Sequence, residues 1–418
     1  MSRNSVFLST LTVGVLTVIL TGACALPAQF GPGDAVLGVA DSTFHLLAVQ
    51  PGGSWSTVTH LPFGPLWDLI PSPDNKNLYL ATFGMNNGVF DIAPSGAVST
   101  VLALTGRESP ATLILDGNGD LYVSGTSTMV MKYSQGVLTT FVTGIHGALF
   151  GSAIDLNNGD LLCAVGNGIV RVPTYGTPGW SWARQDPGGS QAPQGLTYDP
   201  ANNWLIEPKT TKTGSQIWRY DLTLSTLITP TPTLPMTVTG FGHVTRDPTT
   251  GEFLVGGFNQ TNGSLLFRYD ATANTITSMV VMKHAAQASF GASVALVGSR
   301  NLSTMKPAGP GQKLTLRVSS LNGAGRSYLA ALSFGFRPGI TVGGRTIYLN
   351  PDALFYFSLS GGVFQNFVGI LDGNGEAFPT VQIPNIPALS GQRIYASAVT
   401  VVQNTLNVVS NPIVITIQ

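Results

Sequence analysis

The chain has 418 residues, of which 10% are charged, and its 20 basic and 20 acidic residues give a formal net charge of zero. A balanced charge without a basic stripe argues against a nucleic-acid-binding protein and against attachment to an anionic membrane surface. Fifty glycines and 27 prolines favour strands and turns over helices. A hydrophobic content of 43% is still enough to form packed cores.

The N-terminal segment differs from the rest of the chain. Residues 1–25 carry one charge, Arg3, before a continuous apolar run that ends at Ala23-Cys24-Ala25. This arrangement is typical of a signal peptide, so we predict an extracytoplasmic protein, secreted or at the cell surface, with no membrane span in its mature form. Two alternatives stay open. The run is close to the length of an uncleaved anchor, and LTGAC is similar to a lipoprotein box that would acylate Cys24, although Thr21 stands where Leu is usual.

A repeat of about forty residues follows. Each unit reads as a short strand, a turn that begins with Asp, a strong second strand and two further strands. The successive turn aspartates are 42, 39, 44 and 48 residues apart. They are Asp74, Asp116, Asp155, Asp199 and Asp247. Self-similarity at this period, with about four short strands per unit, predicts a β-propeller.

Two fragments flank the five full units. Residues 34–61 contain three strand-like runs without an opening strand, and residues 289–298 are similar to an opening strand with nothing after it. We predict that they combine into one blade, because closing the ring with both ends removes the free sheet edges. The sequence therefore predicts a six-bladed propeller over residues 34–298, with seven blades as the alternative.

The units resemble the NHL-repeat and TolB-like six-bladed propellers, the group that contains streptogramin-lyase-like and lactonase-like proteins. The resemblance is carried by the D-x-x-G-x-L-Y-V pattern of DGNGDLYV and by GVLTTF in the same unit. It implies a fold more than a function. Lactonase-like relatives imply a channel metal held by an acid and amides, and streptogramin-lyase-like relatives imply a His and Glu pair on the channel face, where His243 could serve.

The C-terminal part loses the forty-residue period. Residues 299–312 are predicted to be a polar linker, and residues 313–418 contain about eight strand-like runs, LFYFSLS among them, which predict a β-sandwich. LDGNGEA, IPNIPALSG and SNPIVITI resemble a C-terminal module of exported bacterial proteins. That resemblance implies a structural, attachment or recognition role.

The stretches LDGNGDLY and LDGNGEAF raise the question of calcium. Asp116, Asn118 and Asp120 match the start of a calcium loop, but an EF-hand also requires Gly at position 6 and an acid at position 12. These positions hold Leu121 and Ser127. Asp and Asn accept backbone hydrogen bonds in turns and Gly supplies positive φ. We therefore predict structural turns, no metal and no cofactor, with adventitious cation binding as the alternative.

The candidate site lies in the segments that lead into the inner strands, because these line one face of a propeller channel. His60, His146, His243 and His284 are assigned to such segments. Histidines beside acids can bind a metal or act as an acid and base, but no metal-ligand spacing or catalytic motif is present. The candidate binding residues are Trp67, Asp68, Glu108, His146, Gln194 and His243.

We therefore expect an exported, non-catalytic binding or interaction protein for an extracellular ligand or surface component. Two alternatives remain: a channel-face hydrolase or lyase, which rests on fold analogy alone, and a purely structural surface component. Convergence of His146, His243, Asp68 and Glu108 in the channel mouth would favour the enzyme, because shared chemistry needs hydrogen-bond contact.

Overall fold

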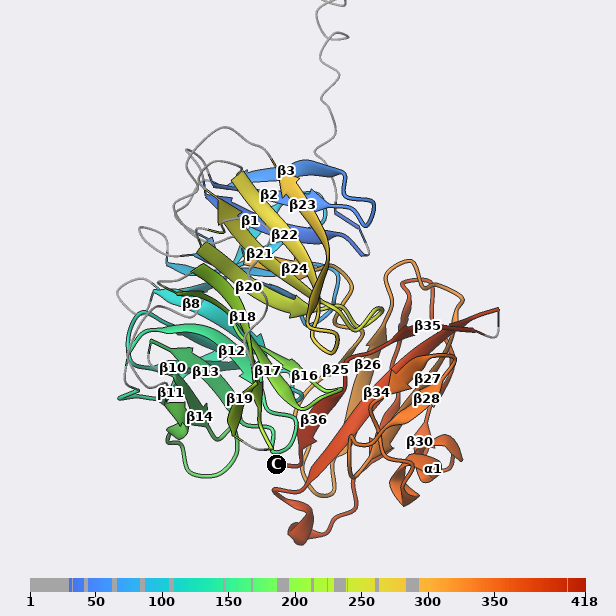
Figure 1. The fold of residues 1–418 in the computed structure, drawn as a ribbon. Helices are drawn as coiled ribbons and strands as arrows, with labels where there is room; N and C mark the ends of the chain where they lie inside the picture. Colours follow the sequence, from blue (N-terminus) through green and yellow to red (C-terminus); the bar gives the residue numbers. More distant parts are fainter. Residues whose placement is uncertain are drawn as a thin grey trace, which may run out of the picture.

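The structure is a computed structural model of the chain. The described residues are 30–31, 33–40, 44–61, 66–82, 87–104, 109–145, 147–166, 168–185, 195–211, 214–223, 225–228, 238, 240–259, 263–282, 293–403 and 405–418. The predicted signal peptide over 1–25, with Cys24, lies outside them. Figure 1 shows a ring of strands, coloured blue to yellow, beside a C-terminal group of sheets in orange and red. No helix in the described ranges is long and apolar enough to cross a membrane.

Five blades are antiparallel sheets of four consecutive strands. Blades two and three contain β4 (Leu66–Pro71), β5 (Leu78–Thr82), β6 (Gly88–Ile92), β7 (Val98–Ala103), β8 (Pro110–Leu115), β9 (Leu121–Gly125), β10 (Val130–Ser134) and β11 (Val137–Val142). Blades four to six contain β12 (Leu149–Ile154), β13 (Leu161–Val165), β14 (Gly168–Val172), β15 (Ser181–Gln185), β16 (Thr197–Asp199), β17 (Trp204–Thr211), β18 (Gly214–Asp221), β19 (Thr226–Ile228), β20 (Gly240–Arg246), β21 (Phe253–Asn259), β22 (Gly263–Asp270) and β23 (Thr275–Met282). The first strand of each blade is the inner one.

The remaining blade is assembled from both ends of the propeller. Its inner strand β24 (Ser293–Leu296) pairs with β1 (Ala35–Ala40), which is followed by β2 (Phe44–Val49) and β3 (Trp55–Leu61). The pairing joins Ala35 to Leu296 and Gly38 to Ser293. The predicted ring closure and the six-bladed propeller are confirmed, and the seven-bladed alternative is wrong.

The aspartate turns have one local design. Asp116 Oδ1 accepts the N–H groups of Asn118 and Asp120 at 2.9 Å each, and Gly119 has φ +83°. Asp372 Oδ1 likewise accepts the N–H groups of Asn374 and Glu376, at 2.8 and 2.9 Å. The two LDGNG stretches therefore use the same turn chemistry in two different parts of the chain, as the sequence predicted.

The C-terminal part contains two five-stranded sheets, a short hairpin and two short helices. The first sheet contains β25 (Leu302–Thr304), β26 (Lys313–Ser319), β30 (Phe364–Gln365), β32 (Glu376–Ala377) and β33 (Thr380–Gln382). The second contains β27 (Ser327–Ser333), β31 (Val368–Ile370), β34 (Arg393–Val402), β35 (Thr405–Val409) and β36 (Ile413–Thr416). The hairpin is β28 (Ile340–Val342) with β29 (Arg345–Ile347), and the helices are α1 (Ala353–Leu359) and η1 (Pro387–Leu389). Leu314, Leu316, Ala330 and Ala396 pack between the two sheets, so the predicted sandwich is present.

Two local expectations for this part differ from the structure. The run LFYFSLS, predicted to be a strand, forms α1, because the Asp352 carboxylate caps the helix by accepting the N–H of Phe355 at 3.0 Å. The predicted linker over 299–312 contains β25, which pairs with β26. An apolar run cannot by itself distinguish a short helix from a strand.

The sandwich packs against the end of the propeller where the aspartate turns lie. Ile413–Thr416 (β36) brings Val414 into one apolar cluster with Leu156 and Leu196 of the propeller. Polar contacts across the boundary include Thr304 to Gly117, Arg246 to Asn411, Tyr395 to Asn157, Arg337 to Tyr198, and Arg300 to Leu115 and Asp116. One end of the propeller channel is therefore closed by the chain's own C-terminal part.

Candidate functional site

Four inner strands contain a β-bulge at a corresponding position near the end of the channel that is remote from the sandwich. The extra residue is Trp67 in β4, Ala111 in β8 and Phe150 in β12. In β20 the register shifts between Phe241 and Val244, which places His243 in the bulge. Bulges turn side chains away from the regular pleat and are common beside functional sites. The bulges therefore determine which side chains lie at this end of the channel.

Asp68 is the centre of a buried network that joins three blades. Its Oδ1 lies 3.0 Å from Nδ1 of His243 and accepts the N–H of Leu69 at 2.7 Å. Its Oδ2 accepts the N–H of Leu113 in the next blade at 2.6 Å. Asp68 and His243 are 3% and 8% exposed, and β24 packs between the strands that carry them. The pair therefore reaches across the inner strand of the closing blade.

The network continues around the channel. Thr112, which interacts with Asp68, has its hydroxyl 2.7 Å from that of Ser152 in the following blade, and both residues are buried. The inner strands of blades four, five and six pack closely against one another at glycine residues. A Cβ on Gly151 would lie 2.6 Å from the backbone of Gly195, and a Cβ on Gly195 would lie 2.8 Å from the Cα of His243. These close contacts fix the backbone that carries His243.

An aromatic pair lies at the same end of the channel. The rings of Trp67 and Phe150, from blades two and four, are 5.7 Å apart between centroids and inclined by 32°. Both are the extra residues of their bulges. Two blades that are not neighbours in the ring therefore meet through aromatic contact at the channel mouth.

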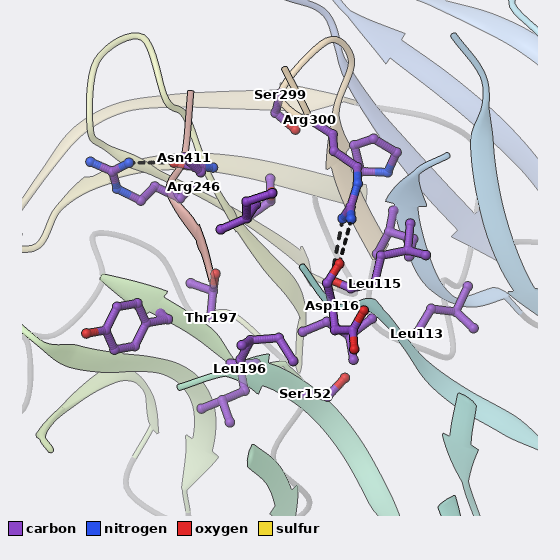
Figure 2. A pocket seen from close by; sticks show the side chains of 18 of the residues that line it. Leu113, Leu115, Asp116, Ser152, Leu196, Thr197, Arg246, Ser299, Arg300 and Asn411 are labelled. Carbon is purple, nitrogen blue, oxygen red and sulfur yellow. Dashed lines mark hydrogen bonds between the residues drawn. The ribbon is translucent and has the colours of Figure 1, made fainter. Parts of the chain in front are cut away.

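A cavity of about 250 Å³ lies in the channel between this network and the sandwich. Its walls come from the inner strands of all six blades and from residues 299–302 and 411–414. Figure 2 shows Arg300 reaching the main chain of Leu115 and Asp116 at one side of this cavity. Arg246 reaches Asn411 at the other side.

Burial shifts the proton affinity of three groups along the channel. It raises the pKa of Asp68, while His243 and the N–H donors of Leu113 and Leu69 act in the opposite direction. Burial, with the Asp120 carboxylate, raises the pKa of Asp116 to about 7. Burial lowers the pKa of the Arg300 guanidinium to about 10, so it stays charged at neutral pH.

The structure brings together some of the candidate residues. Asp68 and His243 are in contact, and Trp67 is adjacent to Asp68 but packs on Phe150. Glu108, His146 and Gln194 lie outside the described residues, as does His284. His60 does not lead into an inner strand: it lies in β3, the outermost strand of its blade, with its ring 5.7 Å from that of His45. That assignment was wrong because the strand extends farther than its sequence indicates.

Sequence reasoning missed Thr112, Ser152 and Phe150. Thr112 lies three residues after the start of SPATLIL, Ser152 lies two residues after the start of FGSAID, and Phe150 is the first residue of FGSAID. A polar residue within the apolar part of successive inner strands, four residues before Asp116 and three before Asp155, is a signal that could have found Thr112 and Ser152. The bulges that aim these residues leave no comparable mark in one sequence.

The chemistry available to the pair is limited by its hydrogen bonds. Both oxygens of Asp68 accept main-chain N–H groups, so the carboxylate is oriented and held in place. It can in turn orient the imidazole of His243, as carboxylates commonly do. Among the residues that the structure describes, no three His, Cys, Asp or Glu side chains gather closely enough to hold a metal ion.

Comparison with solved structures identifies the architecture. A nidogen/laminin complex contains a chain with a TM-score of 0.51 and 14% identity, and the match covers 63% of this chain and 98% of that one. The likeness shows a β-propeller. A streptogramin B lyase (TM-score 0.42, 13% identity, 90% of this chain and 98% of that one) and TolB from Acinetobacter baumannii (TM-score 0.48, 12% identity, 68% and 70%) are also similar. The β-propeller fold expected from the sequence is therefore confirmed.

Sequence comparison adds no family. No protein-family model matches the chain, and no curated protein matches it in sequence.

Proposed function

We propose that the protein is exported and acts as a non-catalytic binding protein, which engages an extracellular ligand or surface component through the propeller face remote from the sandwich. The observation that carries the proposal is the bonding of Asp68. Its two oxygens are taken up by the N–H groups of Leu69 and Leu113 and by His243. An acid held in this way ties blades together, whereas a general base must reach the proton that it abstracts.

The difference between the two faces of the propeller supports the choice of the binding face. Contacts from Thr304, Asn411 and Tyr395 occupy the face formed by the aspartate turns. The opposite face carries the Trp67–Phe150 pair at the channel mouth and the exposed connection Thr126–Thr128. Loops that a rigid scaffold holds in place are a common site of recognition.

The alternative is a hydrolase or lyase that acts in the channel, and the 3.0 Å contact between His243 and Asp68 favours it. Solved structures of similar fold include a gluconolactonase and a streptogramin B lyase, so a sugar lactone and a streptogramin B are the substrates to test. We expect no turnover above buffer from the purified full chain with either substrate, and no bound metal by elemental analysis. Turnover that is lost in His243→Ala would contradict the proposal.

A second experiment tests whether the propeller face remote from the sandwich binds a surface component. Envelopes of the producing cells serve as the probe, and the fraction of purified protein that sediments with them is the readout. We expect Thr126→Arg with Thr128→Arg to lower this fraction by about tenfold, because arginine introduces charge and bulk into a contact surface. Val137→Arg, at the other end of the same blade and 60% exposed, is the control. Equal sedimentation of both variants and the native chain would place binding elsewhere.

A further inference from the structure

The sandwich has an apolar surface at its far edge, formed by α1 and β31. Tyr356 and Phe357 of α1 are 62% and 65% exposed, and Val368 and Ile370 of β31 are 59% and 68% exposed. Val363, between them in sequence, is 62% exposed. We call these five residues the edge patch. Large side chains exposed together in this way mark interaction surfaces.

The edge patch is continuous because α1 and β31 cover successive parts of one edge of β27. Leu332 donates its N–H to Ser358 Oγ of α1 at 3.1 Å. Two residues earlier, Ala330 donates its N–H to the carbonyl of Phe367, just before β31, at 2.7 Å. Helix and strand therefore lie end to end along the same side of the sheet.

Strand β31 offers an open edge with its backbone groups directed outward. Among the described residues its one sheet neighbour is β27. The carbonyl of Phe367 and the N–H of Leu371 both bond toward β27. Since successive residues of an antiparallel strand direct their groups to opposite sides, those of Val368 and Ile370 point away from β27. Natural proteins usually protect such an edge with charge or proline, yet residues 353–371 contain neither.

We propose that this edge is the interface with a second copy of the chain, with β31 pairing antiparallel to β31 of the partner about a two-fold axis at Gly369. In this register Val368 faces Ile370 of the other copy, and these two pairs exchange four main-chain hydrogen bonds. Gly369 lies opposite Gly369 of the second copy. Its Cβ position is directed at Tyr328 of its own chain, not at the interface. Apolar cross-strand pairs then lie on one face.

The absence of charge on this edge and the surface area that it can bury both favour a second copy of the chain as the partner. A charged surface would repel itself, whereas the 19 residues from Ala353 to Leu371 bring no charge, and Asp372 would face the neutral Asn366. At the stated exposures, aromatic side chains of roughly 150–250 Å² each leave about 200–300 Å² of Tyr356 and Phe357 accessible. With the aliphatic residues and the backbone edge, two copies bury roughly 800–1,000 Å², which is below the size of stable interfaces and in the range of weak, transient ones. The dimer is therefore weak, with a Kd on the order of 10–100 µM.

Sedimentation equilibrium of the full chain, from about 1 to about 300 µM, tests the proposal. We expect a monomer–dimer equilibrium that Ile370→Lys weakens by about 100-fold, because it places an unpaired charge in the interface. Val137→Lys, at a site in the propeller that is 60% exposed, should leave the dimer unchanged. A native chain that stays monomeric throughout, or a dimer that persists in Ile370→Lys, would overturn the proposal.

Disulfide trapping tests the register without relying on a charged variant. In the proposed pairing a chain with both Val368→Cys and Ile370→Cys forms two symmetric intermolecular disulfides on mild oxidation, because opposed residues lie about 5.5 Å apart. A covalent dimer on non-reducing electrophoresis is the expected result. Covalent dimer formed equally by Val137→Cys would show random collision and contradict the proposal.

Discussion

The two ends of the propeller channel use acidic residues in different ways. At the mouth, Asp68 accepts bonds from its own blade, from the next blade and from His243, so one carboxylate links three blades. At the closed end, Asp116 satisfies the N–H groups of its own turn, and contact with the sandwich is made by the backbone of that turn. At one end a side chain accepts bonds that hold the ring together, and at the other the backbone of the turn accepts bonds from side chains of the C-terminal part, such as Thr304 and Arg300.

Removal of the mouth carboxylate should have the largest effect. Asp68→Ala is expected to lower the free energy of unfolding by about 3–5 kcal/mol, because His243 and two buried N–H groups lose their partner. Asp74→Ala removes an acid from the other end, where the carboxylate bonds locally to Lys76 N–H and the hydroxyl of Ser72. A loss of about 1 kcal/mol is expected there. Urea unfolding measures both, and equal losses would show that the two ends do not differ.

The turn glycine of the closed end should come next. A Cβ on Gly117 would lie 1.8 Å from the carbonyl oxygen of Val414, so Gly117→Ala requires the sandwich to move away. We expect a loss of about 2–4 kcal/mol, at or above the usual cost of overpacking, and faster proteolysis between the domains. Gly166→Ala is the matched control, because no atom lies within 4 Å of its Cβ position. Destabilisation of both variants by the same amount would remove the role assigned to the interface.

These two positions show what the sequence could and could not predict. The aspartate spacing predicted the blades, and the incomplete units at residues 34–61 and 289–298 predicted the ring closure, because a propeller repeat leaves a regular mark. The DGNG turn was correctly predicted as a turn. Its second property, the space that Gly117 leaves for Val414, depends on a residue almost 300 positions away and has no local signature.

The candidate site was predictable to a similar depth. Asp68 and His243 were selected because they flank inner strands, but their contact depends on bulges in β4 and β20 that one sequence does not reveal. The helix α1 was missed for a local reason: LFYFSLS has the composition of a strand, and the cap at Asp352 decides its conformation. Long-range register and single capping bonds are therefore the features that this sequence does not predict.

At the closed end, Asp116 should make the stability of the protein depend on pH, and this effect should be smaller than the two above. The pKa of Asp116 is raised to about 7 in the folded chain, above its ordinary value of about 3.9. The folded state therefore binds this proton more tightly, and the resulting stabilisation is present at low pH and is lost as the pH rises from about 4 to about 7. Asp116→Asn cannot ionise but keeps the acceptor for the turn, so it should lose less stability than the native chain over this range.

Thermal unfolding at several pH values measures this difference. The comparison is between slopes, so a constant offset caused by the substitution itself does not matter. Asp74→Asn is the control, since its turn lies at the same end of the propeller and its carboxyl is half-buried. Parallel pH curves for the native chain and Asp116→Asn would contradict the assignment of the shifted group.

The smallest expected effect isolates one hydrogen bond between the domains. Thr304 is buried and donates its hydroxyl to the carbonyl of Gly117 at 2.7 Å. Thr304→Val keeps the shape but leaves that carbonyl without this donor, so we expect a loss of about 1–2 kcal/mol. Thr139→Val is the control, because Thr139 is exposed and its contact with the Lys132 carbonyl is 3.4 Å long; a change within about 0.5 kcal/mol is expected. If Thr304→Val is also neutral, the domains are held by the apolar contacts around Val414 and by backbone packing at Gly117, and the polar contacts serve to set the orientation of the sandwich on the turns.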